Sequence, residues 1–432
     1  MRFQLIIAIF LMFNSVSTVL NAQSSNLDLE KIMTGKDFTG YWPENHSWLP
    51  NGEIVFNWNP EKKLKSEFYT VTSNSPEILK DEEIATLPNW NTIRHSSNSF
   101  YAYLKNGRIF KWDSTKLSPK VVYQTYDYIH SPQLVANPHK IYFVKDQTLC
   151  SINTDSFNYC EVLKFEKPTA KSDKSKQETY LENQQLELFE FHKRRLKIKN
   201  NNEEFTDRVN KWKRDPIKFK NGKIQDIYIS YDEKSVIYIH VEHKESKITH
   251  VENYSNNSGW SATKKARPKV GRDEKEESLN LFYLENDSSL VISINHLSGI
   301  YNRPIYLKDY EKDKFHSKYK SPKLVAYHKP IFNHAGDQAI VEIRSLDNKD
   351  RWITILDLKS GNLKEIDHQH DTAWIGGPGI SGWNSYQGAL GWMDDGRSIW
   401  YQSEETGYSH LYKKSISKLK KTTLTSGKFE VR

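Results

Sequence analysis

The sequence predicts an all-β protein, built as an incomplete β-propeller of about six recognisable blades with one helical insertion. Aromatic residues make up 13% of the 432 residues, a composition that favours strands. Helices alternating with strands, the pattern of a parallel sheet, are missing from most of the chain. A turn followed by an apolar-alternating strand recurs at spacings of roughly 40 to 60 residues, which is typical of propeller blades. A β-sandwich array is the alternative, and the recurring turn favours the propeller.

Residues 1–22 are expected to be a signal peptide. Arg2 supplies the positive charge, Leu5 to Phe13 is an apolar run, and Ala22 before Gln23 offers a small residue for cleavage. A membrane anchor is the alternative, but the apolar run is shorter than the ~20 residues that a spanning helix needs. The mature chain is therefore expected to be residues 23–432, exported to the periplasm or secreted.

The recurring turn is the signal that orders the rest of the chain. In each copy an aromatic or apolar residue precedes a turn rich in Asn, Asp and Gly, and a strand follows. Four strong copies and two weaker ones occur: Trp48 to Gly52, Ile229 to Lys234, Phe332 to Asp337 and Trp392 to Gly396, with Leu104 to Gly107 and Asn137 to Lys140 as the weaker pair. We expect each copy to belong to one blade.

The two cysteines, Cys150 and Cys160, flank a segment whose Asn153-Thr154-Asp155 is typical of a hairpin turn. In an exported chain this placement predicts a disulfide between them. Two separate buried thiols are the alternative. Neither interpretation gives a metal or catalytic cysteine, because no second pair or suitably spaced His accompanies them.

The formal charge of +8 becomes +7 without residues 1–22, which hold Arg2 and no acid. Its densest source is Lys193 to Lys199, at the end of a helix predicted over Lys176 to Lys199. Acidic residues precede this basic end, an order that suits the dipole of a solvated helix. We therefore expect a helical insertion and no nucleic-acid partner.

Five segments resemble the N-terminal propeller of the prolyl oligopeptidase and dipeptidyl peptidase IV family. They are Gly40 to Pro60, Ala266 to Gly271, Arg344 to Asp367, Asp371 to Gly379 and Gly391 to Val431, the last with the order SE-x-x-G-Y-x-H-L-Y and then L-T-x-G-x-x-E-V. In that family a serine-hydrolase domain follows the propeller and the propeller limits access to it. The resemblance implies that residues 23–432 are the substrate-gating part of a secreted bacterial serine peptidase acting in proteolysis. It also implies that the C-terminal blades and the α/β-hydrolase domain, against which the chain would pack, are absent.

Catalytic residues are not expected in this chain. The nucleophile of the family lies in G-x-S-x-G, which does not occur in the sequence. The nearest look-alike, around Ser381, lacks the second glycine at the required place. No residues for a cofactor or a metal are predicted.

Two polar groups could form sites, but the sequence favours neither. Glu203-Glu204 resembles a pair that could hold a peptide's amino terminus, but it lies in a polar run, and basic residues stand where the family has its acidic pair. Asp367 to Asp371 brings four potential ligands together, yet alternate side chains on a strand point to opposite sides. Asn-x-Ser sequons at Asn45, Asn253, Asn256 and Asn286 are expected to be chance in an Asn-rich chain.

The alternative function is a non-catalytic secreted propeller that binds peptides or a cell-envelope partner.

Overall fold

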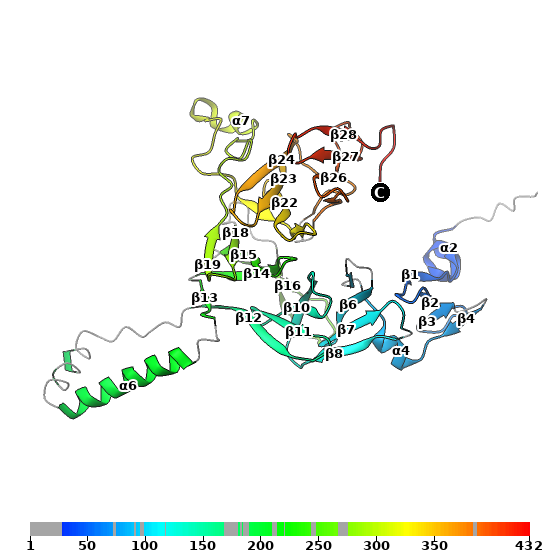
Figure 1. Cartoon of the computed structure of the whole chain (residues 1–432). Helices are drawn as coiled ribbons and strands as arrows, with labels where there is room; N and C mark the ends of the chain where they lie inside the picture. Colours follow the sequence, from blue (N-terminus) through cyan, green and yellow to red (C-terminus); the bar gives the residue numbers. More distant parts are fainter. Residues whose placement is uncertain are drawn as a thin grey trace, which may run out of the picture. The chain divides into compact units, whose positions relative to one another are not determined.

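The computed structural model describes residues 28–71, 75–89, 92–95, 99–116, 118–167, 180–181, 184, 190–209, 214–219, 221–242, 248–266, 275–382 and 387–432. The chain divides into two compact units, residues 1–87 and residues 88–432 (Figure 1). The predicted signal peptide, residues 1–22, lies outside the described residues. Within the part of the chain that is described, no helix is long and apolar enough to cross a membrane.

The first unit holds one four-stranded antiparallel sheet. Its strands are β1 (Glu44–Trp48), β2 (Ile54–Trp58), β3 (Glu67–Val71) and β4 (Pro76–Ile78), with helices α2 (Leu29–Met33), α3 (Lys36–Thr39) and α4 (Asp81–Thr86). Asp28 caps α2 by accepting a hydrogen bond from the amide of Lys31 at 2.6 Å. Aromatic side chains from β2 and β3 pack together, with the rings of Phe56 and Tyr69 stacked 5.9 Å apart.

The second unit contains five larger sheets, which follow one another along the chain. The second sheet of the protein is β5 (Ile93–Arg94), β6 (Phe100–Lys105), β7 (Arg108–Asp113) and β8 (Lys120–Gln124); the third is β9 (Ile129–Leu134), β10 (Lys140–Lys145), β11 (Thr148–Asn153) and β12 (Tyr159–Glu166), with β13 (Ile217–Lys218) at its edge. The fourth is β14 (Lys223–Ile229), β15 (Ser235–Glu242), β18 (Glu276–Tyr283) and β19 (Ser288–Val291), with the hairpin β16 (Thr249–Asn253) and β17 (Ala262–Ala266) inserted.

The fifth and sixth sheets complete this unit. The fifth is β20 (Val325–Tyr327), β22 (Gln338–Ser345), β23 (Asp350–Asp357) and β24 (Leu363–His370), with β21 (Ile331–Phe332) also paired to β22. The sixth is β25 (Leu390–Trp392), β26 (Ser398–Ser403), β27 (His410–Ser415) and β28 (Lys421–Thr423). Between the fourth and fifth sheets lie α7 (Leu307–Glu311) and a short 3-10 helix (Lys312–Lys314).

The recurring turns occupy matching places in these sheets. Five of the six copies lead into the second strand of their sheet, namely β2, β10, β15, β22 and β26, and the copy at Leu104 to Gly107 leads into β7. Two equivalent turns touch: a Cβ on Gly336, whose φ is +75°, would meet the amide nitrogen of Asp232 at 2.4 Å. A glycine is needed there because of both the positive φ and the close approach. The repeat predicted from the sequence is a repeat of structure.

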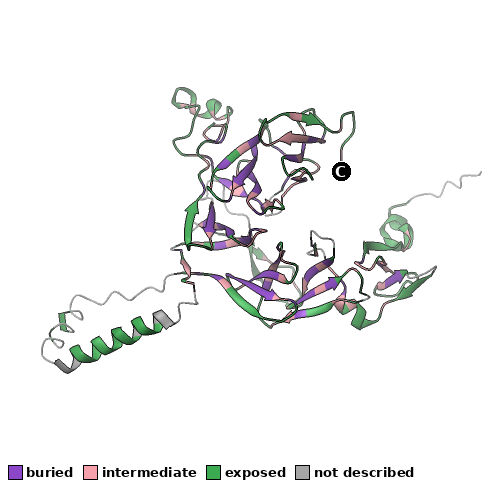
Figure 2. Ribbon diagram, viewed as in Figure 1, coloured by how far each residue is buried: buried purple, intermediate pink, exposed green. Residues whose placement is uncertain are grey.

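Alternate residues of each central strand pack against different neighbouring sheets. On β15, Ile237 belongs to a core shared with the fifth sheet, whereas Val236 belongs to a core shared with the third. Two further cores join the second sheet to the third and the fifth to the sixth (Figure 2). Strands buried on both faces explain why these segments are apolar almost throughout. Consecutive antiparallel sheets stacked face against face are propeller blades, so the predicted all-β fold with about six blades is confirmed.

The helical insertion extends further along the chain than the sequence predicted. Helix α6 spans Glu190–Val209, and its described side chains are exposed (Figure 2). The prediction over Lys176 to Lys199 is confirmed for residues 190–199 and for Tyr180, Leu181 and Gln184, which are also helical, and its other residues lie outside the described part. Past Lys199 the helix runs on to Val209 through Asn, Thr and Val residues, whose low helix propensities are weak enough to be overridden.

Candidate functional site

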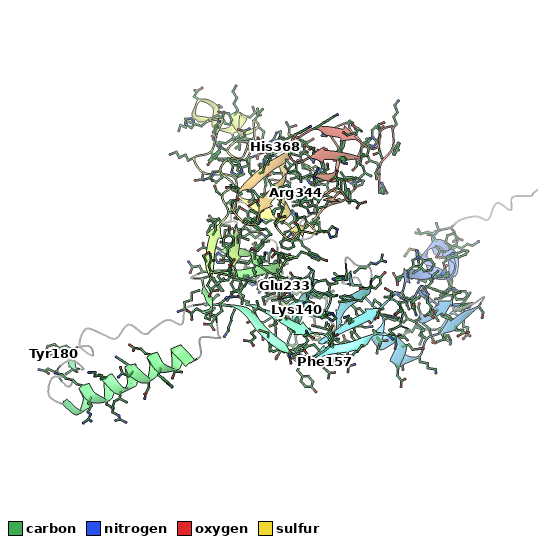
Figure 3. The ribbon with its side chains drawn as sticks, viewed as in Figure 1. Lys140, Phe157, Tyr180, Glu233, Arg344 and His368 are labelled. Carbon is green, nitrogen blue, oxygen red and sulfur yellow. The ribbon has the colours of Figure 1, made fainter. Side chains whose placement is uncertain are left out.

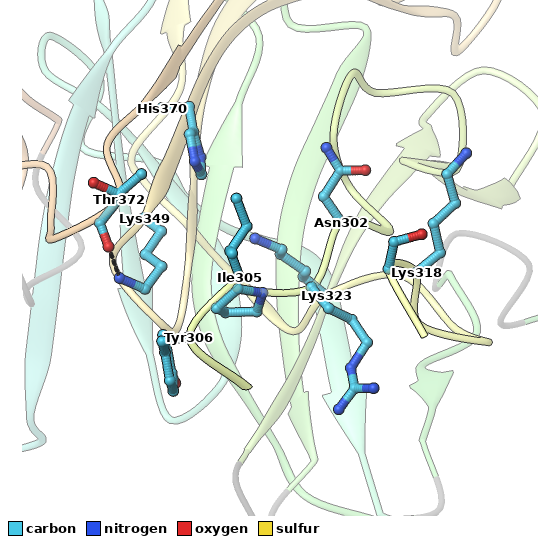
Figure 4. A pocket seen from close by; sticks show the side chains of 11 residues that line it. Asn302, Ile305, Tyr306, Lys318, Lys323, Lys349, His370 and Thr372 are labelled. Carbon is cyan, nitrogen blue, oxygen red and sulfur yellow. Dashed lines mark hydrogen bonds between the residues drawn. The ribbon is translucent and has the colours of Figure 1, made fainter. Parts of the chain in front are cut away.

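A cavity of about 400 Å³ opens beside the fifth sheet (Figure 4). Part of its wall comes from the segment between β19 and β20, with residues 302–306, Ser317, Lys318 and Lys323. The rest comes from Lys349 in the turn between β22 and β23, and from His370 and Thr372 at the end of β24. The cavity is thus formed where a long connection folds over the ends of two strands.

The described lining carries four permanently cationic side chains and no carboxylate: Arg303, Lys318, Lys323 and Lys349. Two of these charges are already neutralised by carboxylates that do not line the cavity. The guanidinium of Arg303 donates to Glu311, at 2.9 Å from Nη1 to Oε2, and Lys323 contacts both Asp347 and Asp350. The ammonium of Lys349 instead donates to the backbone carbonyls of Thr372 and Ala373, the latter at 2.8 Å. The wall of the cavity therefore has an excess of positive charge.

Asp350, on β23, fixes two of the lining residues. One carboxylate oxygen lies 2.9 Å from Nε2 of His368 and 2.8 Å from Nδ1 of His370, and the other accepts from Lys323. Burial would raise the pKa of Asp350, but the hydrogen bonds from His368, Lys323 and His370 outweigh it and lower that pKa to about 2. The carboxylate is therefore ionised at any physiological pH and holds Lys323 and His370 in place.

The imidazole of His368 is anchored to the core on its other side. It stacks on the indole of Trp352, with ring centroids 5.3 Å apart and an interplanar angle of 5°. The indole nitrogen of Trp352 in turn donates to the carbonyl of Ser298 at 2.8 Å. His368, and through it Asp350, is thus connected to buried aromatic packing.

A second charged group lies buried between the fifth and sixth sheets. Arg351 donates to Glu342 at 2.5 Å from Nε to Oε1, and also to the carbonyl of Gln402 on β26 at 2.7 Å. Arg344 donates to the carbonyls of Ile375 and Ser381. Burial would raise the pKa of Glu342, but the charges of Arg351 and His328 and the amide of Gly388 lower it. These contacts tie the loop that follows β24 to the two sheets.

A third group of ionisable side chains lies at the first strands of the third, fourth and fifth sheets. The side chain of Gln133 on β9 donates to the carbonyl of Ile227 on β14, so these two strands are neighbours. Burial raises the pKa of Asp226 and lowers the pKa of His130 and of Lys329, and the charge of Asp226 partly offsets both of the latter shifts. The first strands of the third and fourth sheets, and the residues that follow β20 in the fifth, therefore present partly buried charges to one another.

The cysteines lie on the neighbouring strands β11 and β12, as the hairpin prediction required, but the structure has both as free thiols. Cys160 pairs with Ser151 and Cys150 pairs with Glu161, so the two side chains point to opposite faces. Cys150 is buried in the core shared by the second and third sheets, and Cys160 is exposed. This corrects the expected disulfide, which would need a register shift of one residue.

The five-residue run Asp367 to Asp371 is divided by the pleat of β24, as alternation requires. His368 and His370 face Asp350, whereas Asp367 contacts Lys414 at 2.8 Å. Asp371 accepts from the backbone amides of Ala373 and Trp374 and so closes a turn. Among the described residues, no group of three or more His, Cys, Asp or Glu side chains is arranged to hold a metal ion.

The other candidate site residues and the sequons lie in loops, turns, strands and a helix. Ser381 is 3% exposed in the loop bound by Arg344, and Glu203-Glu204 lies on α6. The sequons fall on β1, on the β16–β17 hairpin and in the β18–β19 turn. The cavity and the two charged clusters were not predicted. A usable signal existed, since Glu342, Arg344 and Arg351 interrupt strands that are otherwise apolar.

Comparison with known proteins gives structural likeness only. No protein-family model and no curated protein sequence matches the chain. Dipeptidyl peptidase 4 from Porphyromonas gingivalis is 13% identical with a TM-score of 0.49, over 94% of this chain and 50% of that one. A candidate dipeptidyl aminopeptidase IV from Bacteroides ovatus is 9% identical with a TM-score of 0.43, over 90% of this chain and 48% of that one. The chain spans about half the length of these structures, and the fold assignment above rests on its own sheets.

Proposed function

We propose that this chain is the propeller part of an exported serine peptidase of the prolyl oligopeptidase type, where it limits which peptides reach a hydrolase domain. The observation that carries the proposal is in the sixth sheet. The two halves of the motif that resembles this family, SE-x-x-G-Y-x-H-L-Y and L-T-x-G-x-x-E-V, are separate in sequence but bond to each other in space. The motif is therefore one packed unit in this chain, which supports the resemblance on which the proposal rests.

The contacts of that motif are specific. His410 lies 3.2 Å from Oγ1 of Thr425 and 3.0 Å from the carbonyl of Gly427. The amide of Ser409 donates to Glu430 at 2.7 Å, and the amide of Val431 donates to the carbonyl of Ser409 at 3.0 Å. Each of these motif residues either bonds to the other half of the motif or shapes the loop that does. The two halves therefore hold each other in place through the His, Thr, Gly, Glu and Val of the motif.

The gating role is supported by the first-strand cluster of His130, Asp226 and Lys329. A peptide carries charged termini and many hydrogen-bonding groups, and the partly buried charges of this cluster offer it partners. The nucleophile, its general base and its oxyanion donors would come from the hydrolase domain. The peptide substrates, the hydrolase partner and export by residues 1–22 all belong to this proposal.

The second candidate function is a non-catalytic exported propeller that binds peptides or a cell-envelope partner. The cation-lined cavity beside the fifth sheet favours it, since its charged lining offers partners to a bound molecule. The two functions differ in whether the reading frame continues beyond Arg432 into a hydrolase domain.

Sequencing the coding DNA beyond Arg432 and expressing the complete reading frame separates these functions. The peptidase proposal expects an open frame with G-x-S-x-G, and a product that is labelled by a fluorophosphonate probe until that serine is replaced by alanine. A stop codon directly after Arg432, or an extended product that is never labelled, would reject the peptidase and favour the binding module. N-terminal sequencing of the periplasmic fraction tests export, with Gln23 as the expected first residue.

A further inference from the structure

We propose that the cavity beside the fifth sheet binds a small organic anion in which a carboxylate or phosphate lies next to an apolar group. The proposal goes beyond the gating function and does not depend on it. It rests on the charge, the rigidity and the apolar rim of the cavity.

Lys349 provides the main argument from charge. The residue is only 9% exposed, and among the described residues no carboxylate lies within ion-pair distance of its ammonium, which donates to two neutral carbonyls. A largely buried charge without a counter-ion is costly, because carbonyl dipoles replace only part of its hydration. An anion in the cavity would supply the missing opposite charge. Lys318, which is exposed on another part of the wall and also has no ion pair in the described chain, adds a second cation.

The wall is held in place before any ligand arrives. Lys323 is fixed by Asp347 and Asp350, and His370 is fixed by Asp350. Arg303 is fixed by Glu311 and lies over the rings of Phe315 and Tyr319, at 5.5 and 5.2 Å from their centroids. A ligand would therefore not have to order these side chains, which lowers the entropic cost of binding.

An apolar rim stands beside the cations. Ile305 is 75% exposed and Tyr306 is 52% exposed, and the ammonium of Lys349 lies 5.6 Å from the centre of the Tyr306 ring. An anion with an adjoining apolar or aromatic group would contact both features at once. The volume of about 400 Å³ lies at the lower end of the range for small-molecule sites, roughly 300 to 1,000 Å³. The site therefore suits a small molecule or the end of a peptide.

Calorimetric titration with three probes tests the proposal. N-acetylphenylalanine carries a carboxylate beside an aromatic ring, phenyl phosphate carries a phosphate there, and N-acetylphenylalaninamide carries no charge. We expect at least one of the two anions to bind and the amide not to bind. Affinity should fall about fivefold or more in Lys349→Gln and in Lys318→Gln, and it should weaken as salt rises from about 0.05 to about 0.5 M.

Lys418→Gln is the matched control, because it removes the same charge from an exposed turn between β27 and β28. Tighter binding of N-acetylphenylalanine would assign a carboxylate ligand, such as a peptide end, and tighter binding of phenyl phosphate would assign a phosphate. The proposal is overturned if neither anion binds, if the amide binds equally well, or if Lys418→Gln weakens binding as much as the cavity variants. Lys318→Gln keeps the test valid if Lys349→Gln does not fold, since Lys318 is exposed.

Discussion

Arg351 and Glu342 form an ion pair in which both side chains are completely buried, with Nε 2.5 Å from Oε1. Glu342 lies on β22 opposite Ile353, and Arg351 lies on β23 opposite Arg344, so the pair is diagonal across two strands. A second cation, Arg344, thus faces Arg351 directly, and the carboxylate between them offsets their repulsion. The fifth blade therefore depends on a charge balance as well as on apolar packing.

Arg351→Met is expected to lower the free energy of unfolding by about 3 to 5 kcal/mol, because it leaves the carboxylate of Glu342 buried without its partner. Lys413→Met is the control: its contact with Asp395, at 3.1 Å, is between side chains that are 35% and 40% exposed, and its loss should cost less than about 1 kcal/mol. Urea unfolding of both variants measures the difference. Adding Glu342→Leu to Arg351→Met should recover part of the loss. Equal, small effects of the two single variants would show that the buried pair is not needed.

Asp350 makes stability depend on pH in the acid range. Its pKa falls from 3.8 to about 2 in the folded protein, so the folded state binds the proton less readily than the unfolded chain does. The resulting stabilisation, about 2 kcal/mol, is present above about pH 5 and is lost as the pH falls toward 2. Asp350→Asn should be less stable at neutral pH and should lose less further stability on acidification. Asp309→Asn, at an exposed carboxylate, should behave like the unaltered protein. Parallel pH curves for Asp350→Asn and the unaltered protein would contradict this account.

The two cysteines should react as separate thiols. Burial raises the pKa of Cys150 to about 11, whereas Cys160 is exposed. We expect a maleimide to modify one thiol per native molecule quickly, and Cys160→Ser to abolish that fast reaction. The second thiol should react only after unfolding. An intact mass lower by two hydrogens, with no alkylation before reduction, would restore the disulfide predicted from the sequence.

Ser381 is expected to be structural. It is 3% exposed, and its carbonyl accepts a hydrogen bond from Arg344, which positions the loop after β24. The chain ending at Arg432 should therefore not be labelled by a fluorophosphonate probe, and neither Ser381→Ala nor the exposed control Ser360→Ala should change that result. Labelling that disappears only in Ser381→Ala would make this serine a nucleophile.

The blades could be predicted from the sequence, whereas the sequence marks some charged residues within strands but not which residues they pair with. The recurring turns are local signals, since residues such as Gly336 are required by the backbone of the turn itself. The partnership of Glu342 with Arg351, and of Asp350 with Lys323, depends on strand register and on how a long connection folds back, neither of which is encoded locally. The same reason explains why the free state of the two cysteines was not predicted. The hairpin was predicted, but a change of one residue in strand register decides whether the two thiols face each other. The end of helix α6 was predicted too early because propensity alone marks helix ends poorly.

The central claim, that consecutive sheets pack against one another as blades, is tested most directly by zero-length carbodiimide cross-linking of the unaltered protein, followed by peptide mass spectrometry. The reagent joins a lysine to a carboxylate only where they touch. Two pairs bridge neighbouring blades: Lys140 with Glu233, at 2.7 Å between the third and fourth sheets (Figure 3), and Lys414 with Asp367, at 2.8 Å between the fifth and sixth. We expect both links, alongside the link within the sixth sheet between Lys413 and Asp395. If the Lys413 link forms while both bridging links are missing, or if Lys140 is joined instead to the sixth sheet, the order of blades described here is wrong.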